Sequence, residues 1–555
     1  MTSVPSHQPA VAAGSHGSVG QDLQTFVRLL PPRSRRYDPD KLRQLADQMI
    51  GNEGDSASNE PDGEENLLIP AGYTYFGQFI DHDLTFDTTS SLGNPGSIPT
   101  NLRTPRLDLD CLYGTGPDNQ PYLYAARNIG PLRKGVSLVP GRSLPGSPGR
   151  FDLPRIAEAN GDTLAIADDA RAIIGDPRND ENAIVCNLQA AFISFHNRVV
   201  EWVEASGLVK EKDFFVASQK IVRWTYQKIV VRDYLRRLID PLVYESFRQD
   251  LRDLGEEAFV LYPLNTRQNF TKIPLEFAGA AYRFGHSMIR TGYKLNTGHV
   301  PQKIFTPERG IDSLLGFGRL RDDHWIEWNR FFPHNDQFPA GGSRPLVNNN
   351  TSDERLQWAY RIDTSLVDPL KVLPAVVSGG NSLADLNLRR GDLFRLASGQ
   401  SVASVLGLDP LSPDYLVVRD NARGSYGYMP IDSTFHHDTP LWFYVLAEAQ
   451  RPLVELWLAK NDGVPGPAKL EEEDLLGTRQ ENGQSVGAPV TQLGPVGGRI
   501  LLETFYGLLF SDPDAYGRIK LAADMDLWRS WLAHFTANGE RSMSMATLLQ
   551  VAGLT

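Results

Sequence analysis

The sequence contains very little cysteine, and it also lacks other features that mark whole classes of protein. Only two of its 555 residues are cysteines, Cys111 and Cys186, so a disulfide scaffold is excluded and both thiols are expected to be small, buried hydrophobes. Basic charge is scarce as well, because 55 Lys and Arg face 67 Asp and Glu and leave a net charge of −12. This balance argues against nucleic acid or an anionic membrane as the main partner.

Long hydrophobic runs are also missing. No apolar stretch approaches the roughly 18 residues that a membrane span requires. The longest candidate, LLETFYGLLF, contains Glu503 and is better interpreted as a core helix. Residues 1–20 lack the basic and apolar regions of a secretion signal, so they are predicted to be a disordered lead-in. A cytoplasmic location is the default expectation, with secretion by another route left open, and no motif indicates the oligomeric state.

The sequence does contain several segments with the pattern of amphipathic helices. Hydrophobic residues make up 41% and charged residues 22% of the chain, as in a soluble globular protein. Between the helical segments lie loops rich in Pro, Gly, Ser and Asn, without a repeat or an interdomain linker. We therefore predict one large, mainly α domain over residues 21–555, with long irregular loops and little β-structure. The 3.6-residue apolar period predicts helices at Ala183–Ala205, Asp213–Ile239, Pro274–Ile289, Pro440–Lys460 and Gly498–Leu509.

One short segment, GQFIDHDLTFD (Gly77–Asp87), is unusually polar for its apolar surroundings. On a helix, Gln78 and His82 share a face, while Asp83 is rotated by about 100° from His82. A Gln–His face suits proton handling, and an aspartate pointing elsewhere suits a hard cation or a helix cap. The apolar neighbours disfavour a solvated surface helix. A zinc site is disfavoured because DHD lacks the usual ligand spacing.

This segment resembles the distal-histidine segment of the animal-type haem peroxidases, within the peroxidase–cyclooxygenase superfamily. Four further segments that resemble this family follow in the family's order. The resemblance implies the animal peroxidase fold and a haem b cofactor. It also implies that His82 is the distal acid–base catalyst and that Gln78, on the same helix face, holds a distal water or halide.

The second segment, TPRLDLDCLYG, resembles the calcium loop of the family. The resemblance implies side-chain oxygen ligands from Thr104, Asp108 and Asp110, a carbonyl ligand from Arg106, and completion of the shell by Asp83. Oxygen ligands of this kind are those that Ca²⁺ prefers. Relatives often carry serine where this chain has Asp110, so the ligand charge is higher here. An ordinary polar turn is the alternative interpretation.

The third segment, GDPRNDEN, resembles the arginine–glutamate segment of the family. It implies that Arg178 is the distal arginine, which polarises bound peroxide. Asp81 and Glu181 match the two carboxylates that form ester bonds to haem methyl groups. The next position is methionine in myeloperoxidase and Asn182 here, so the sulfonium link to a haem vinyl is expected to be absent. Without the resemblance, this segment would be read as a charged turn at a helix start.

The last two segments, AYRFGHSMIR and DLNLRRG, resemble the proximal part of the family's site. They imply that His286 coordinates the haem iron, with Arg283 near the haem and Gly285 allowing close approach of the macrocycle. Asn387 would accept a hydrogen bond from the ring of His286 and fix its tautomer. On sequence alone, a buried structural histidine is the alternative for His286.

Three other histidines are not assigned to the site. His196 lies on the apolar stripe of the helix that follows Glu181 and is interpreted as a core histidine with satisfied hydrogen bonds, although it is the best rival axial ligand. His436 and His437 are adjacent, so they point apart on a regular element and make a poor metal pair. Both are interpreted as structural.

The activity that the resemblance implies is reduction of hydrogen peroxide through a ferryl intermediate, coupled to oxidation of a halide, a pseudohalide or a small organic donor. A cyclooxygenase-like fatty-acid dioxygenase is the first alternative, disfavoured because the loosely comparable stretch WIEWNRFFPHND lacks tyrosine. A non-enzymatic haem-binding or adhesion module is the second. It would predict loss of His82, Arg178 or His286, and all three are present.

Overall fold

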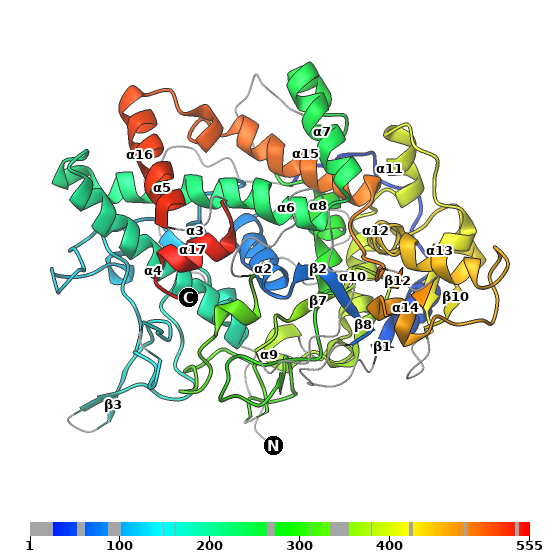
Figure 1. Ribbon diagram of the computed structural model, residues 1–555, viewed down its shortest axis with the longest axis horizontal. Coiled ribbons are helices and arrows are strands. Elements are labelled where there is room, and N and C mark those ends of the chain that lie inside the picture. Colours follow the sequence, from blue (N-terminus) through cyan, green and yellow to red (C-terminus); the bar gives the residue numbers. More distant parts are fainter. Residues whose placement is uncertain are drawn as a thin grey trace.

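The computed structural model describes residues 26–52, 62–86, 101–147, 149–160, 163–262, 272–310, 312–333, 354–378, 380–420, 426–478, 480–481, 484–485, 487–538 and 543–555. The predicted lead-in at residues 1–20 therefore lies outside the described residues, as does Asp87. Helices dominate the described part, and irregular segments connect them (Figure 1). The prediction of a mainly α architecture with long loops is confirmed.

The α-helices range from single turns to 24 residues, and α4 is the longest in the described part. Several are joined by short 3₁₀ segments, and a π-helical turn, Val230–Tyr234, separates α5 from α6. The helices are α1 (Pro39–Met49), α2 (Gly72–Leu84), α3 (Asp110–Tyr113), α4 (Ala183–Ser206), α5 (Phe214–Ile229), α6 (Leu235–Leu238), α7 (Pro241–Leu254), α8 (Leu275–Gly279), α9 (Ala375–Ser378), α10 (Leu383–Leu393), α11 (Gly399–Val405), α12 (Leu441–Ala449), α13 (Arg451–Ala459), α14 (Glu472–Leu476), α15 (Pro495–Ser511), α16 (Ala522–Asn538) and α17 (Met545–Val551).

Strands in the described residues are short and pair only two by two. β2 pairs antiparallel with β7 beside the start of α2, and β1 pairs parallel with β8. The sheets are too small to form a layer, so they act as local ties between loops. The strands are β1 (Ile50–Asn52), β2 (Glu65–Pro70), β3 (Glu158–Asn160), β4 (Thr163–Ala165), β5 (Gly292–Tyr293), β6 (Gln302–Lys303), β7 (Trp358–Tyr360), β8 (Leu366–Val367), β9 (Val417–Arg419), β10 (Tyr428–Pro430), β11 (Gln480–Glu481) and β12 (Gln484–Ser485).

Helix α2 lies near the middle of the molecule and is buried on almost every side (Figure 1). It packs against α4, β2 and a 3₁₀ helix at Ala281–His286. Gly77 permits the close approach of a neighbouring helix, because a Cβ atom at this position would lie 2.5 Å from the hydroxyl of Tyr234. A helix buried all round can carry polar side chains only where partners or a cavity receive them.

Two of the predicted helices are broken in the structure. The predicted helix at Pro274–Ile289 is instead α8 followed, after a break at Ala280, by the 3₁₀ helix Ala281–His286. The predicted helix at Pro440–Lys460 is α12 and α13, which meet at Gln450 with Pro452 in the first turn of the second helix. Proline lacks the amide hydrogen that would continue the preceding helix.

The other helix predictions are confirmed within a few residues. α4 begins at Asn182, whose side chain accepts hydrogen bonds from two backbone amides of the first turn, and it ends at Gly207 in a left-handed conformation. Cys111 and Cys186 are buried free thiols, as expected. Within the described residues, no helix is both long and apolar enough to cross a membrane.

Candidate active site

A cavity of about 270 Å³ lies between α2, α10 and the 3₁₀ helix Ala281–His286. Among the predicted haem-site residues, seven line it: Gln78, Asp81, His82, Glu181, Arg283, His286 and Asn387. These residues come from segments as much as 309 positions apart in the chain. The rest of the cavity wall combines apolar and polar surface: aliphatic side chains from residues 370–386 and several tyrosines.

His82 is held by a residue that the sequence analysis did not single out. Its Nδ1 lies 2.7 Å from Oδ1 of Asn179, and the amide nitrogen of Asn179 donates a 2.8 Å hydrogen bond to Gln189 of α4. Because Gln189 fixes the orientation of the amide, Asn179 presents an acceptor to His82. The ring therefore carries its proton on Nδ1 and keeps the lone pair on Nε2.

Burial and the positive charge of Arg178, opposed by Asp176 and Asp81, lower the pKa of His82 to about 4. The imidazole is therefore neutral at neutral pH. A neutral imidazole with a free Nε2 lone pair can accept a proton from a molecule in the cavity. Asn179 carried no sequence signal beyond its place in the arginine–glutamate segment.

Arg178 does not line the cavity, in contrast to the direct contact with bound peroxide that the resemblance implies. Its guanidinium forms an ion pair with Asp176 (Nη2–Oδ2 2.7 Å) and donates to the backbone carbonyls of His82 (3.1 Å) and Thr85 (2.6 Å). It also lies over the ring of Phe86. In this arrangement Arg178 anchors the end of α2 and acts on the cavity through its charge.

Gln78 and Glu181 meet at the cavity wall. The Gln78 amide nitrogen lies 3.4 Å from a carboxylate oxygen of Glu181, and its carbonyl oxygen accepts a 3.1 Å hydrogen bond from Asn182. Asn182, at the position of the family's methionine, thus caps α4 and orients Gln78. Burial raises the pKa of Glu181 to about 7, opposed by Arg178 and Gln78. Asp81 accepts a 2.9 Å hydrogen bond from Thr85 and also faces the cavity.

His286 meets the predicted partner, Asn387, across 101 residues of sequence. The Asn387 amide nitrogen lies 2.8 Å from Nδ1, and the direction of this bond depends on the tautomer of the ring. A half-turn of the amide would let its oxygen accept from Nδ1–H, and this direction leaves the Nε2 lone pair free for a metal. Burial, Arg283 and Arg390 lower the pKa of His286 to about 3, which keeps the ring neutral.

These residues fit a flat iron macrocycle. His286 supplies a neutral imidazole that lines the cavity and contacts Asn387 through Nδ1. Beside it, a Cβ atom on Gly285 would meet nothing within 4 Å, so the space next to the ligand is open. Three-residue periodicity in the 3₁₀ helix brings Arg283 and His286 to one side, and both line the cavity. Asp81 and Glu181 add two carboxylates to the same wall.

A second cluster forms on the other side of α2, where Asp83 meets Asp108 and Asp110. One carboxylate oxygen from each lies within 4.8 Å of the others. Thr104 joins them through its hydroxyl, which donates to Asp108 (2.7 Å) and lies 3.4 Å from Asp110. Thus four of the five predicted calcium ligands come together by their side chains, and the backbone of Arg106 lies in the same loop.

The electrostatics of this cluster disfavour three ionised carboxylates at once. Burial and the like charges of the neighbouring carboxylates raise the pKa of Asp83 well above its usual range and, against the opposing charge of Arg103, that of Asp110 to about 7. Both carboxylate oxygens of Asp83 are buried without a hydrogen bond of normal geometry among the described residues, although the Leu109 amide and Tyr226 hydroxyl lie near. An oxygen-preferring cation would satisfy this donor set.

The residues that were set aside lie outside the cavity. His196 is buried and bonded to the Tyr113 hydroxyl (3.0 Å) and the Val136 carbonyl (2.9 Å), which confirms its interpretation as a satisfied core histidine. The described part of the stretch WIEWNRFFPHND does not line the cavity either.

Tyrosines from other elements do line the cavity: Tyr73, Tyr75, Tyr234 and Tyr282. The lack of tyrosine in the stretch WIEWNRFFPHND therefore does not distinguish a peroxidase from a dioxygenase. None of these four residues was singled out from the sequence, although Tyr282 lies in the segment AYRFGHSMIR and Tyr75 lies on α2, three residues before Gln78.

Comparison with known proteins agrees with the geometry. Residues 96–314 match the family model "Animal haem peroxidase". A peroxidase-like protein of Margaritifera margaritifera is 25% identical over 370 residues, which cover 57% of this chain and 43% of the relative; the chain thus matches less than half the length of that relative. Peroxidase A from Dictyostelium discoideum has the same fold, with a TM-score of 0.51 at 15% identity over 95% of this chain and 93% of that one. A fatty acid alpha-dioxygenase from Oryza sativa aligns with a TM-score of 0.48 at 13% identity over 96% of this chain and 80% of that one.

Proposed function

We propose that this chain, in which residues 96–314 match the family model "Animal haem peroxidase", is a haem-dependent peroxidase that reduces hydrogen peroxide and oxidises a small donor. The observation that carries the proposal is that His82 and His286 line one cavity, each engaged at Nδ1 by an asparagine. His82 is thereby available as a base, and His286 becomes available as a metal ligand once the Asn387 amide turns its oxygen to Nδ1–H. The donor is a halide, a pseudohalide or a small organic molecule.

His286 would hold the haem iron through Nε2, with Arg283 beside it and with Asp81 and Glu181 in place for ester bonds to the macrocycle. When bound, the haem would supply the redox chemistry that accepts two electron equivalents from the donor and passes them to peroxide. Ester bonds through the two carboxylates would add a covalent attachment to the contact with His286. Their formation is part of the proposal.

The chain's own contribution to peroxide reduction is proton handling. His82 Nε2 would accept a proton from hydrogen peroxide in the cavity and return it to the leaving oxygen, so that water departs. Asn179 holds the tautomer that this transfer needs, and burial, helped by the positive charge of Arg178, lowers the pKa of His82 so that the ring is neutral. Gln78, oriented by Asn182, offers amide groups to a water or halide beside the base.

The proposed calcium ion would bind Asp83, Asp108, Asp110, Thr104 and the carbonyl of Arg106. Because Asp83 follows His82 directly on α2, a cation at this cluster would fix the helix end that carries the base. The role of the ion would be structural. Its removal is expected to lower the stability of α2 more than it changes the chemistry in the cavity.

The decisive experiment is to load the protein with haem and to follow its absorption spectrum after one equivalent of hydrogen peroxide is added. His82→Ala should slow the spectral change by about 10²- to 10⁴-fold, the range for loss of a general base. His196→Ala removes another buried histidine outside the cavity and is the matched control. An unchanged rate in His82→Ala would contradict the proposal.

Donor assays separate the alternatives. The wild-type protein should oxidise bromide, iodide, thiocyanate or phenols with peroxide. Linoleate-dependent oxygen uptake without donor oxidation would instead favour the dioxygenase. Haem binding with no response to peroxide would favour a binding module.

A further inference from the structure

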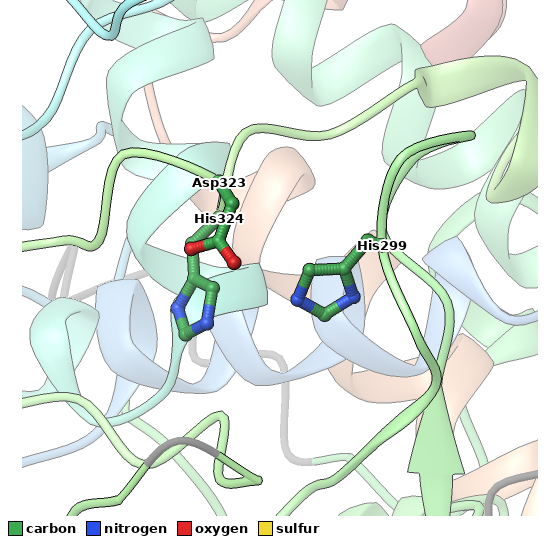
Figure 2. A group of neighbouring side chains, drawn as sticks. All are labelled: His299, Asp323 and His324. Carbon is green, nitrogen blue, oxygen red and sulfur yellow. The ribbon is translucent and has the colours of Figure 1, made fainter.

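A second histidine cluster lies outside the cavity, where His299, Asp323 and His324 converge (Figure 2). His299 belongs to the loop of the β5–β6 hairpin, and the other two belong to the irregular segment that precedes Trp325. One ligand atom from each residue lies within 4.8 Å of the others. The two imidazole rings meet edge to face, with centroids 5.4 Å apart.

The two histidines have hydrogen-bonding capacity that the described residues do not use. His299 is 3% exposed and His324 is 4% exposed. Both ring nitrogens of His299 and Nε2 of His324 are buried without a hydrogen-bond partner in the described part of the chain. A neutral imidazole has one donor and one acceptor nitrogen, and burying either unpaired destabilises the fold. His196, by contrast, is equally buried but has both nitrogens paired.

The backbone around the cluster is firmly held. The Asn296 amide donates to the carbonyls of Asp323 (2.9 Å) and Trp325 (2.8 Å), and the His299 amide donates to the carbonyl of Asn296 (3.1 Å). One asparagine thus ties the two ligand-bearing segments together. The carbonyl of His324 also accepts a 2.8 Å bond from Asn187 of α4. Such preorganisation is what a metal site needs around its ligands.

We propose that His299, Asp323 and His324 form a binding site for one divalent transition-metal ion of the zinc class. Two imidazole nitrogens and one carboxylate are a common three-ligand set for zinc, with water in the fourth position. Since the imidazole nitrogens dominate the donor set, Ca²⁺ and Mg²⁺, which prefer oxygen, are disfavoured. Asp323 is now paired with Arg321, so it would turn one oxygen from the guanidinium to the ion.

The geometry requires a small closure on binding. Donors that each lie about 2.1 Å from a tetrahedral zinc ion are about 3.4 Å apart, so the three side chains would move together by roughly an ångström. The half-exposed carboxylate of Asp323 has the freedom for this movement. The ion would cross-link the β5–β6 hairpin to the segment before Trp325. Ile304 and Phe305, which follow β6 in the chain, line the cavity, so the ion would brace one part of its wall.

The test is zinc uptake by the full-length, haem-loaded protein. Each protein is dialysed against a low micromolar concentration of free Zn²⁺, and its zinc and iron contents are measured by elemental analysis. His299→Leu and His324→Leu should each lose one equivalent of zinc relative to the wild type. His534→Gln, a partly exposed histidine stacked against Trp531, is the matched control and should retain it.

Asp323→Asn keeps the experiment interpretable if a histidine variant folds poorly, because the side chain is half exposed and its replacement should leave the fold intact. It should weaken zinc binding in the same dialysis series. Added zinc should raise the Tm of the wild type and of His534→Gln, but not of the leucine variants. Equal zinc content in the wild type and His299→Leu, or no bound zinc in either, would overturn the proposal. Neither result depends on peroxidase activity, so the proposed function is tested separately.

Discussion

Replacing Asn179 with alanine tests the most specific part of the proposed mechanism, which is the tautomer of His82. In the structure, Gln189 turns the Asn179 amide so that its oxygen accepts from Nδ1–H of His82. Alanine removes this acceptor. The Nδ1 proton would then be buried without a partner, and the ring would gain by moving the proton to Nε2, where it faces the cavity.

The size of the effect follows from the cost of an unpaired buried donor, about 1–3 kcal/mol. If this penalty shifts the tautomer equilibrium by that amount, the form with a free Nε2 lone pair falls in population by roughly 5- to 150-fold, at about 1.4 kcal/mol per factor of ten. The reaction of the haem-loaded protein with peroxide should slow by a similar factor. The affinity for haem should not change, because Asn179 does not line the cavity.

The assay is stopped-flow absorption after mixing with peroxide, and Asn197→Ala is the matched control. Asn197 lies on α4 and makes two side-chain hydrogen bonds, to the amide and carbonyl of Leu138, away from the cavity. Both variants should lose some thermal stability, but only Asn179→Ala should react slowly. Equal rates for Asn179→Ala and the wild type would refute the tautomer argument.

Asn179→Asp gives an independent readout of the same contact. A carboxylate beside Nδ1 stabilises the imidazolium and raises the pKa of His82 from about 4. Since only the neutral ring can accept a proton, the acid side of the pH–rate profile should move to higher pH. A purely structural role for Asn179 would lower the rate at every pH without moving the profile.

Three further predictions concern the haem and calcium sites. Asn387→Asp should make His286 a more anionic ligand and so lower the reduction potential of the haem iron. Spectroelectrochemistry measures this potential, and an unchanged value would exclude the contact in the holoprotein. Glu181→Gln and Asp81→Asn should each remove one ester bond, so that denatured protein releases the haem more readily in mass spectrometry, most completely in the double variant. Asp83→Asn should abolish the fall in Tm that EGTA causes in the wild type; a wild type whose Tm is insensitive to EGTA would count against the calcium site.

The sequence alone, through the family resemblance, named seven residues that line one cavity in the structure. Periodicity placed Gln78 and His82 on one face of α2 and Asp83 on another, and the structure puts the first two in the cavity wall and the third in the acidic cluster. Periodicity also predicted the long helix α4 and its start at Ala183. These features depend on local chain geometry, in which side-chain direction follows from spacing.

Only the tertiary structure decided which distant side chain meets each of these faces. Periodicity does not predict the contact of Asn179 with His82 or the contacts of Arg178 with the carbonyls of His82 and Thr85. Nor does it predict that ring nitrogens of His299 and His324 lack a partner among the described residues. The break at Ala280, which turns one predicted helix into two short ones, is another example. Packing between segments sets these features, because burial selects the hydrogen-bond partner or leaves a polar atom without one.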